Sequence, residues 1–168
     1  MVCDVRSTPY SHYKPDFSRG PLRQHLNAEG IKYAFFGDQL GARPKDRSCY
    51  VSGQAKYDRI ARTDFFNEGI NRLRVGVRKM NLALVCSEKD PIECHRAVLV
   101  CYNLPDLRGN IYHIHPDGSL ECQDRFEQRL VHLHGLTPPP LLQRPGDWES
   151  AVTEAYEKQA AGIAYREG

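Results

Sequence analysis

Apolar residues along the chain occur partly in short continuous runs and partly at helical spacings, a mixture typical of an α/β protein. The clearest run lies within residues 81–86 and predicts a strand that is buried on both faces. β-Branched and aromatic residues predict a second strand over 31–36. Shorter β-prone segments lie at 2–5 and 110–115.

Helical spacing appears between the first two strands. Leu22 and Leu26 are four residues apart and predict a helix over 21–29, which Gly30 ends. Residues 37–53 are polar and rich in glycine and proline, so this segment is predicted to be irregular. Long irregular segments in compact domains are often functional.

Two helices are predicted, one on each side of the strand at 81–86. A helix is expected over 57–80, with a break near Gly69 or Gly76. Asp90-Pro91 is a typical helix start and predicts a helix that runs to about residue 104.

Two further helices are expected near the C-terminus, over 123–134 and 148–165. The prolines at 138–140 predict a stiff connection between them, and Asp117-Gly118 predicts a tight turn. The alternation of strands and helices predicts a Rossmann-like, three-layer α/β/α fold with a mostly parallel sheet, in a single domain over 1–168. In such folds ligands bind at the carboxyl ends of the strands.

Composition narrows the functional classes. The 168 residues are 40% hydrophobic and carry a formal net charge of +2. No apolar run reaches the roughly 20 residues of a membrane-spanning helix, and the first residues lack the pattern of a secretion signal. A cytoplasmic protein without a membrane partner is therefore expected, and its six cysteines are expected to be free thiols.

Two loop segments supply candidate binding residues. Asp4, Arg6 and Ser7 follow the first strand, where Asp4 is a candidate catalytic carboxylate and Arg6 a clamp for phosphate or carboxylate. A purely structural Asp4–Arg6 ion pair explains the same residues equally well. Arg43 follows Gly41 in the long polar segment and is a second candidate anion ligand, although an ordinary solvated loop is the alternative.

The most specific segment covers residues 86–96. Cys86 ends the strand at 81–86, and the next helix is expected to direct its first N–H groups toward the thiol, which favours the reactive thiolate. Glu88 follows as a candidate acid, base or nucleophile. Cys94, His95 and Arg96 are candidate substrate-binding residues.

Each of these side chains has a structural alternative. Cys94 falls on the apolar face of the expected helix, and His95 can simply form a hydrogen bond in the core. Zinc is not favoured, because the spacing of Cys86 and Cys94 differs from the C-x2–4-C of closed structural sites. No other cofactor is predicted, and the oligomeric state is left open.

With these segments in view, the chain resembles the bacterial and archaeal family called domain of unknown function 488. The resemblance is carried by Asp4-Val-Arg6-Ser7-x-Pro9-x-Ser11, Pro15-x-Phe17, Leu40-Gly-x-Arg43-Pro44, Cys86-x-Glu88-Lys89-Asp90-Pro91-x-x-Cys94-His95-Arg96, His113-Ile-His115, Asp117-Gly118, Ala155-Tyr-x-x-Gln159 and Ile163-Ala-Tyr165. It implies a Rossmann-like fold and an enzymatic site of undefined reaction. Two departures are notable: family members usually begin with an additional strand and helix, which are expected to be missing here, and they often carry arginine at His12.

Three functional hypotheses follow. The first is an enzyme acting on a nucleotide or nucleic-acid base, for example by glycosidic-bond hydrolysis, in which Arg6 and Arg43 hold phosphate while Glu88 or Cys86 performs the chemistry. The second is sulfur transfer or phosphatase-like chemistry at Cys86, suggested by a weaker similarity to rhodanese-like domains. The third is non-catalytic binding of a nucleotide or nucleic acid through basic and tyrosine side chains.

Overall fold

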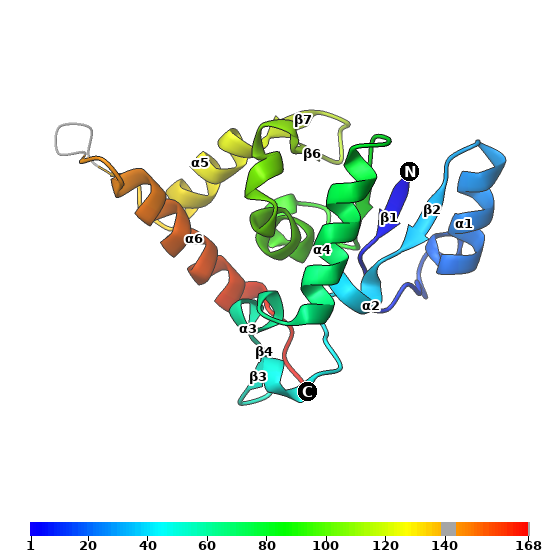
Figure 1. Ribbon diagram of the computed structural model, residues 1–168, viewed down its shortest axis with the longest axis horizontal. Coiled ribbons are helices and arrows are strands. Elements are labelled where there is room, and N and C mark those ends of the chain that lie inside the picture. The colour runs from blue at the N-terminus through cyan, green and yellow to red at the C-terminus, as the bar shows by residue number, and fades with distance from the viewer. Residues whose placement is uncertain (139–143, 168) are drawn as a thin grey trace. The chain divides into compact units, whose positions relative to one another are not determined.

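The computed structural model describes residues 1–138 and 144–167. Its chain divides into two compact units (Figure 1), one comprising Met1–Ser87 with Tyr165–Gly168 and the other comprising Glu88–Ala164. The expectation of a single domain over 1–168 stays a prediction.

A small parallel sheet organises the first unit. It contains β1 (Val2–Asp4), β2 (Tyr33–Phe35) and β5 (Ala83–Val85), in the order β2-β1-β5. The mixed α/β architecture with a parallel sheet is thus confirmed. β5 was expected to be buried on both faces, but its residues are only half-buried, and it lies at one edge of the sheet. The central strand is β1, where Cys3 and Asp4 have no exposed surface.

The helix expected over 57–80 is two helices, α3 (Tyr57–Ala61) and α4 (Asp64–Val77). The predicted break at Gly69 or Gly76 was wrong, because Thr63 separates the helices and its hydroxyl accepts the N–H of Phe66 as an N-cap. Gly69 instead allows close packing, since a Cβ there would lie 2.7 Å from the side chain of Leu40. The first predicted helix is confirmed as α1 (Arg19–Ala28).

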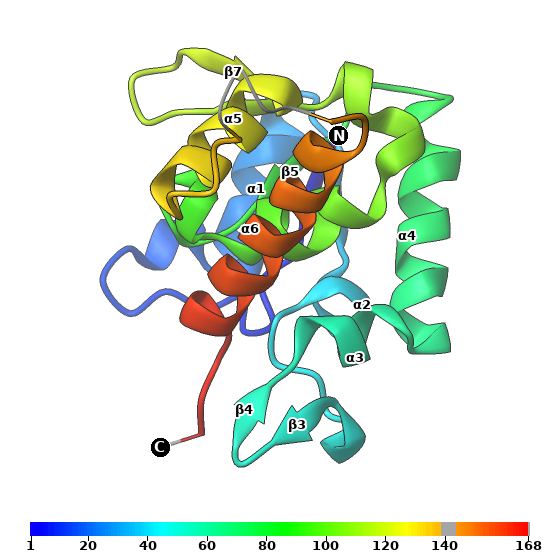
Figure 2. The ribbon, with the colours of Figure 1, turned by 90° about the vertical axis from the view of Figure 1, so that its left-hand side faces the viewer.

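The polar segment 37–53 is more regular than expected. It contains α2 (Gly37–Leu40), a 3-10 turn at Arg47–Cys49 and β3 (Tyr50–Val51). β3 pairs antiparallel with β4 (Gln54–Ala55), and the C-terminal segment returns to this hairpin (Figure 2). There the Tyr165 carbonyl accepts the N–H of Ala55 at 2.9 Å. A 3-10 turn at Pro15–Phe17 precedes α1.

In the second unit, α5 (Gln123–Leu133) and α6 (Asp147–Ile163) confirm the two helices expected near the C-terminus. The strand expected over 110–115 is β6 (Tyr112–Ile114), which pairs with β7 (Leu120–Cys122) across the predicted Asp117-Gly118 turn. Of the expected stiff connection, Pro139 and Pro140 lie outside the described residues.

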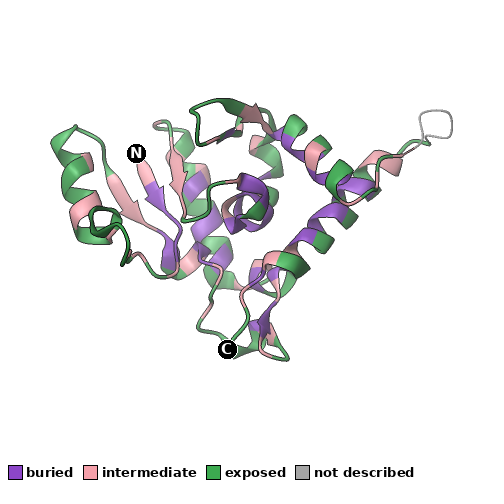
Figure 3. Ribbon diagram, turned by 180° about the vertical axis from the view of Figure 1, so that it is seen from behind, coloured by how far each residue is buried: buried purple, intermediate pink, exposed green. Residues whose placement is uncertain are grey.

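The helix expected over 90–104 is interrupted. Asp90 does cap its start, but the first turn ends after Pro91–Glu93, and Cys94 is extended, with φ −122° and ψ 134°. Helical structure resumes with a π-helical turn at Arg96–Val100 and 3-10 turns at Cys101–Asn103 and Pro105–Asn110. The buried side chains of this unit (Figure 3) include Val98, Leu99, Val100, Phe126, Leu130, Val131 and Tyr156.

Two further expectations bear on function. All six cysteines, each within the described part of the chain, are free thiols as predicted. Within residues 1–138 and 144–167, no helix has the length and hydropathy needed to cross a bilayer.

Candidate active site

Asp4 and Arg6 form a buried ion pair at the end of β1. The Asp4 carboxylate accepts hydrogen bonds from Arg6 Nε at 2.8 Å and Nη2 at 2.6 Å, and from the Tyr33 hydroxyl at 2.7 Å. Burial by itself would raise the pKa of Asp4, but the bonds from Arg6 and Tyr33 outweigh it and lower the pKa below its ordinary value. Asp4 is therefore held ionised.

The guanidinium of Arg6 is largely used inside the protein. Besides its two bonds to Asp4, its Nη1 donates to the carbonyl of Phe17 at 2.9 Å, and only 7% of Arg6 is exposed. This geometry favours the structural alternative, in which the pair fixes the loop after β1. The catalytic role of Asp4 and the substrate-binding role of Arg6 stay predictions.

Ser7 contacts the backbone of Arg43. The Ser7 hydroxyl accepts the backbone N–H of Arg43 at 2.9 Å, which joins the loop after β1 to the loop after α2. Gly41 permits this approach, because a Cβ at that position would lie 2.3 Å from Ser7 Oγ. The exposed Arg43 guanidinium stacks 4.3 Å from the ring centre of Tyr165.

Cys86 follows β5 and is half-buried. Arg6 is close enough to interact with its charge: the pKa of Arg6 is raised mainly by the hydrogen bonds to Asp4, and Cys86 adds a smaller contribution. The strand end therefore places this thiol near the buried ion pair of the first unit.

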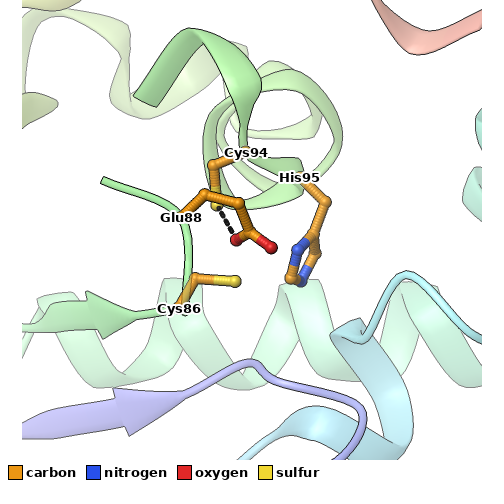
Figure 4. Close-up of side chains that lie close together, drawn as sticks. All are labelled: Cys86, Glu88, Cys94 and His95. Atoms are coloured by element: carbon orange, nitrogen blue, oxygen red, sulfur yellow. Dashed lines mark hydrogen bonds between the residues drawn. The ribbon is translucent and has the colours of Figure 1, made fainter. Parts of the chain in front are cut away.

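Four potential metal ligands converge in the segment that follows. Donor atoms of Cys86, Glu88, Cys94 and His95 all lie within 4.8 Å of one another (Figure 4). Ser87 alone separates Cys86 from Glu88, so one continuous stretch of chain supplies the whole cluster. Cys94 and His95 are buried, whereas Glu88 is exposed.

Cys94 lies directly before the helical structure that resumes at Arg96. Its carbonyl accepts the N–H groups of Ala97 and Val98, and its sulfur accepts the N–H of Arg96 at 3.4 Å. These N–H groups of the next helical turn therefore point toward Cys94, and the expected effect of a helix start on the Cys86 thiol stays a prediction. The Cys94 thiol donates to Glu88 Oε2 at 3.0 Å, so this buried residue also belongs to the polar cluster.

Arg96 holds the loop that carries Glu88. Its guanidinium donates to the carbonyls of Glu88 at 2.7 Å and Lys89 at 3.2 Å. These bonds give Arg96 a positioning role, and its predicted contact with substrate stays a prediction.

Arg129 anchors the turn between Glu88 and Cys94. It forms two bonds to the Asp90 carboxylate, at 2.9 and 3.0 Å, and also binds Glu121 of β7. Burial of Asp90 would raise its pKa, but the bonds from Arg129 and the N–H of Ile92 lower it overall. The loop is thus tied to α5 by an ionised pair.

A comparison with models of protein families finds one family that matches this chain. The model of the family described as domain of unknown function DUF488 matches residues 1–103. The chain belongs to this family. The match covers more than half of the chain and includes every predicted site residue, whereas Arg129 of this DUF488 protein lies beyond it. No curated protein and no solved structure matches the chain.

Sequence reasoning missed Arg129 because Asp90 lies 39 residues away. An arginine within an amphipathic helix is usually solvated, so the local pattern contains no signal for this contact. The one indication is the N-cap carboxylate of Asp90, which would attract a cation from elsewhere in the chain.

Proposed function

We propose that this DUF488 protein is an enzyme that hydrolyses a glycosidic bond of a nucleotide or nucleic-acid base, with Glu88 as the proton-transfer group. The observation that carries the proposal is the exposed Glu88 carboxylate, which accepts a hydrogen bond from the Cys94 thiol at 3.0 Å. A general base must reach both solvent and substrate, and Glu88 is the exposed member of the cluster.

In the proposed reaction, Glu88 takes a proton from a water molecule whose oxygen attacks the anomeric carbon. The bond between the sugar and the base breaks, and the base leaves with a proton from solvent. Lys89 is exposed next to Glu88 and supports an anionic substrate such as a phosphorylated nucleoside. We also propose a Rossmann-like, three-layer α/β/α fold, in which helices cover both faces of the sheet formed by β2, β1 and β5.

Replacing Glu88 with glutamine tests this role. The wild-type protein is incubated with nucleosides, nucleoside monophosphates and single-stranded oligonucleotides, and released bases are quantified by chromatography. We expect base release from at least one substrate and a roughly 100-fold or greater loss in Glu88→Gln, as typical for removal of a general base.

Glu93→Gln is the matched control, because Glu93 is an exposed carboxylate of the same loop outside the cluster. Its activity should equal that of the wild type. Absence of base release from the whole panel, or an active Glu88→Gln variant, would show the proposal to be wrong.

A thiol-based reaction is the second candidate, and the half-buried position of Cys86 at the end of β5 favours it. Iodoacetamide should then label Cys86 at neutral pH before the other thiols, with peptide mass spectrometry as the readout. Cys86→Ser should remove the fast phase of labelling, whereas Cys122→Ser, which replaces another half-buried thiol, should retain it. Uniformly slow labelling would count against this candidate.

A further inference from the structure

We propose that Cys86, Cys94 and His95, completed by Glu88, bind one Zn²⁺ ion. The inference concerns the same side chains as the proposed hydrolysis and rests on that proposal only for the catalytic role of the ion. The proposal of zinc binding itself rests on the types of donor atom, on their separations and burial, and on the hydrogen bonds that hold the ligands in place.

The donor atoms lie near the separations that a tetrahedral ion needs. Zinc–sulfur bonds of about 2.3 Å and zinc–nitrogen or zinc–oxygen bonds of about 2.0–2.1 Å put neighbouring ligand atoms about 3.3–3.8 Å apart. All four donor atoms here lie within 4.8 Å of one another, and the side chains converge on a common centre (Figure 4). Small side-chain rotations would bring them to coordination distance.

The chemistry of the donors selects the ion. Two thiolates and one imidazole are soft or borderline ligands that suit zinc, whereas magnesium and calcium require sets of oxygen ligands. The unfavourable spacing of Cys86 and Cys94 applies to closed structural sites. Here the end of β5 and the turn Pro91–Glu93 bring the two sulfurs together without that spacing.

The surrounding contacts hold the cluster in place. The backbone N–H of Arg96 donates to Cys94 Sγ at 3.4 Å, and such N–H···S bonds stabilise a thiolate ligand. The Arg96 side chain and the Arg129–Asp90 pair fix the backbone on both sides of the turn. The ligands are therefore supported by a second layer of hydrogen bonds, as in metal sites generally.

Exposure differs among the ligands in a way that indicates a catalytic site. Cys94 has no exposed surface and His95 only 6%, whereas Glu88 is exposed. The exposed carboxylate can leave the ion and give its position to water, which leaves three protein ligands, as in catalytic zinc sites. A bound zinc ion would act as a Lewis acid and lower the pKa of that water, and Glu88 would hold the released proton.

Metal binding is tested on the reduced full-length protein without any substrate. After loading with zinc and dialysis against metal-free buffer, elemental analysis should find one zinc ion per chain. The Co²⁺-loaded protein should show an ultraviolet thiolate-to-cobalt charge-transfer band and the strong visible bands of four-coordinate cobalt. Competition with a chromogenic chelator then measures the affinity of each variant.

We expect Cys86→Ser and Cys94→Ser to weaken zinc binding by at least about 100-fold, since loss of second-layer partners alone costs 10–100-fold. Glu88→Gln should weaken it less. Cys122→Ser, which replaces a thiol outside the cluster, should bind like the wild type. Cys94 is fully buried, and its replacement can prevent folding. In that case the zinc affinity of Cys86→Ser, which replaces a half-buried thiol, and the cobalt spectrum of the wild type test the metal site.

Loss of zinc from the wild type on dialysis, a cobalt spectrum without the thiolate band, or wild-type affinity in Cys86→Ser would each overturn the inference. Failure of the proposed function gives a different result, namely stoichiometric zinc without base release. Base release that depends on Glu88 in a protein unable to bind zinc would overturn the metal site alone.

Discussion

At the scale of residues, the same side-chain types serve as internal supports and as exposed chemical groups. Asp4 is fully buried and surrounded by donors from Arg6 and Tyr33, whereas Glu88 is exposed and accepts a bond from a thiol. Breaking a buried ion pair leaves an uncompensated charge and typically costs about 3–5 kcal/mol. Asp4 should therefore be important for stability, and Glu88 for activity.

Asp4→Asn should lower the free energy of unfolding by about 3–5 kcal/mol at neutral pH, because it leaves the buried Arg6 without its counter-ion. The pKa of Asp4 is lower in the folded protein than in the unfolded chain, where it is about 3.9. The ion pair therefore contributes fully above pH ~4, and its contribution is lost as the pH falls through the folded pKa.

Urea unfolding at a series of pH values measures this effect. The difference between the wild type and Asp4→Asn should be largest at neutral pH and shrink in acid. Asp38→Asn, at an exposed position in α2, should follow the wild-type curve throughout. A difference that does not change with pH would contradict the assigned role of the Asp4 charge.

At the scale of elements, small residues decide how closely neighbouring segments approach. Gly37 begins α2, and a Cβ there would lie 2.0 Å from the carbonyl oxygen of Arg6 and 2.7 Å from the ring of Phe35. Thr63 separates α3 from α4 by capping α4. The close approach at Gly37 depends on Arg6, which is distant in sequence. The cap at Thr63 is a local signal, but the apolar periodicity over 57–80 favoured a helix that continues through this residue.

Gly37→Ala should destabilise the protein by about 1–3 kcal/mol, because its methyl group would overlap a backbone oxygen that cannot move independently. Gly20→Ala is the matched control, since a methyl group at Gly20 in α1 would meet no atom within 4 Å and should add up to about 1 kcal/mol of stability. Thermal and urea unfolding compare the two variants. Equal stability of both would refute the assigned close approach.

At the scale of the whole molecule, the family match and the compact units divide the chain differently. The match with DUF488 ends at residue 103, whereas the second unit continues to Ala164. Arg129 and Glu121 lie beyond the match, yet they hold Asp90 within the segment that carries the cluster. Residues outside the matched region thus contribute to the candidate site.

The local pattern was sufficient for most elements and for the chemistry of residues 86–96. Apolar spacing, caps and turn residues act over a few positions, so α1, α5, α6, the Asp117-Gly118 turn and the Asp90 cap follow from the sequence. The Cys86–Arg96 segment was likewise selected by residue types and by its place after a strand.

Tertiary contacts decided which of those side chains act together. The sequence did not reveal that β1 is the central strand or that Cys94 turns toward Glu88, and it left the Asp4–Arg6 ion pair as one of two alternatives. The strand order depends on where distant backbone comes to lie, whereas the contacts of Asp4 with Arg6 and of Glu88 with Cys94 depend on the exact path of a short loop. A hydrogen bond or ligand contact requires positions accurate to tenths of an ångström. Residue types and periodicity specify segments, whereas the convergence of four donor atoms depends on the folded path of the chain over residues 86–95.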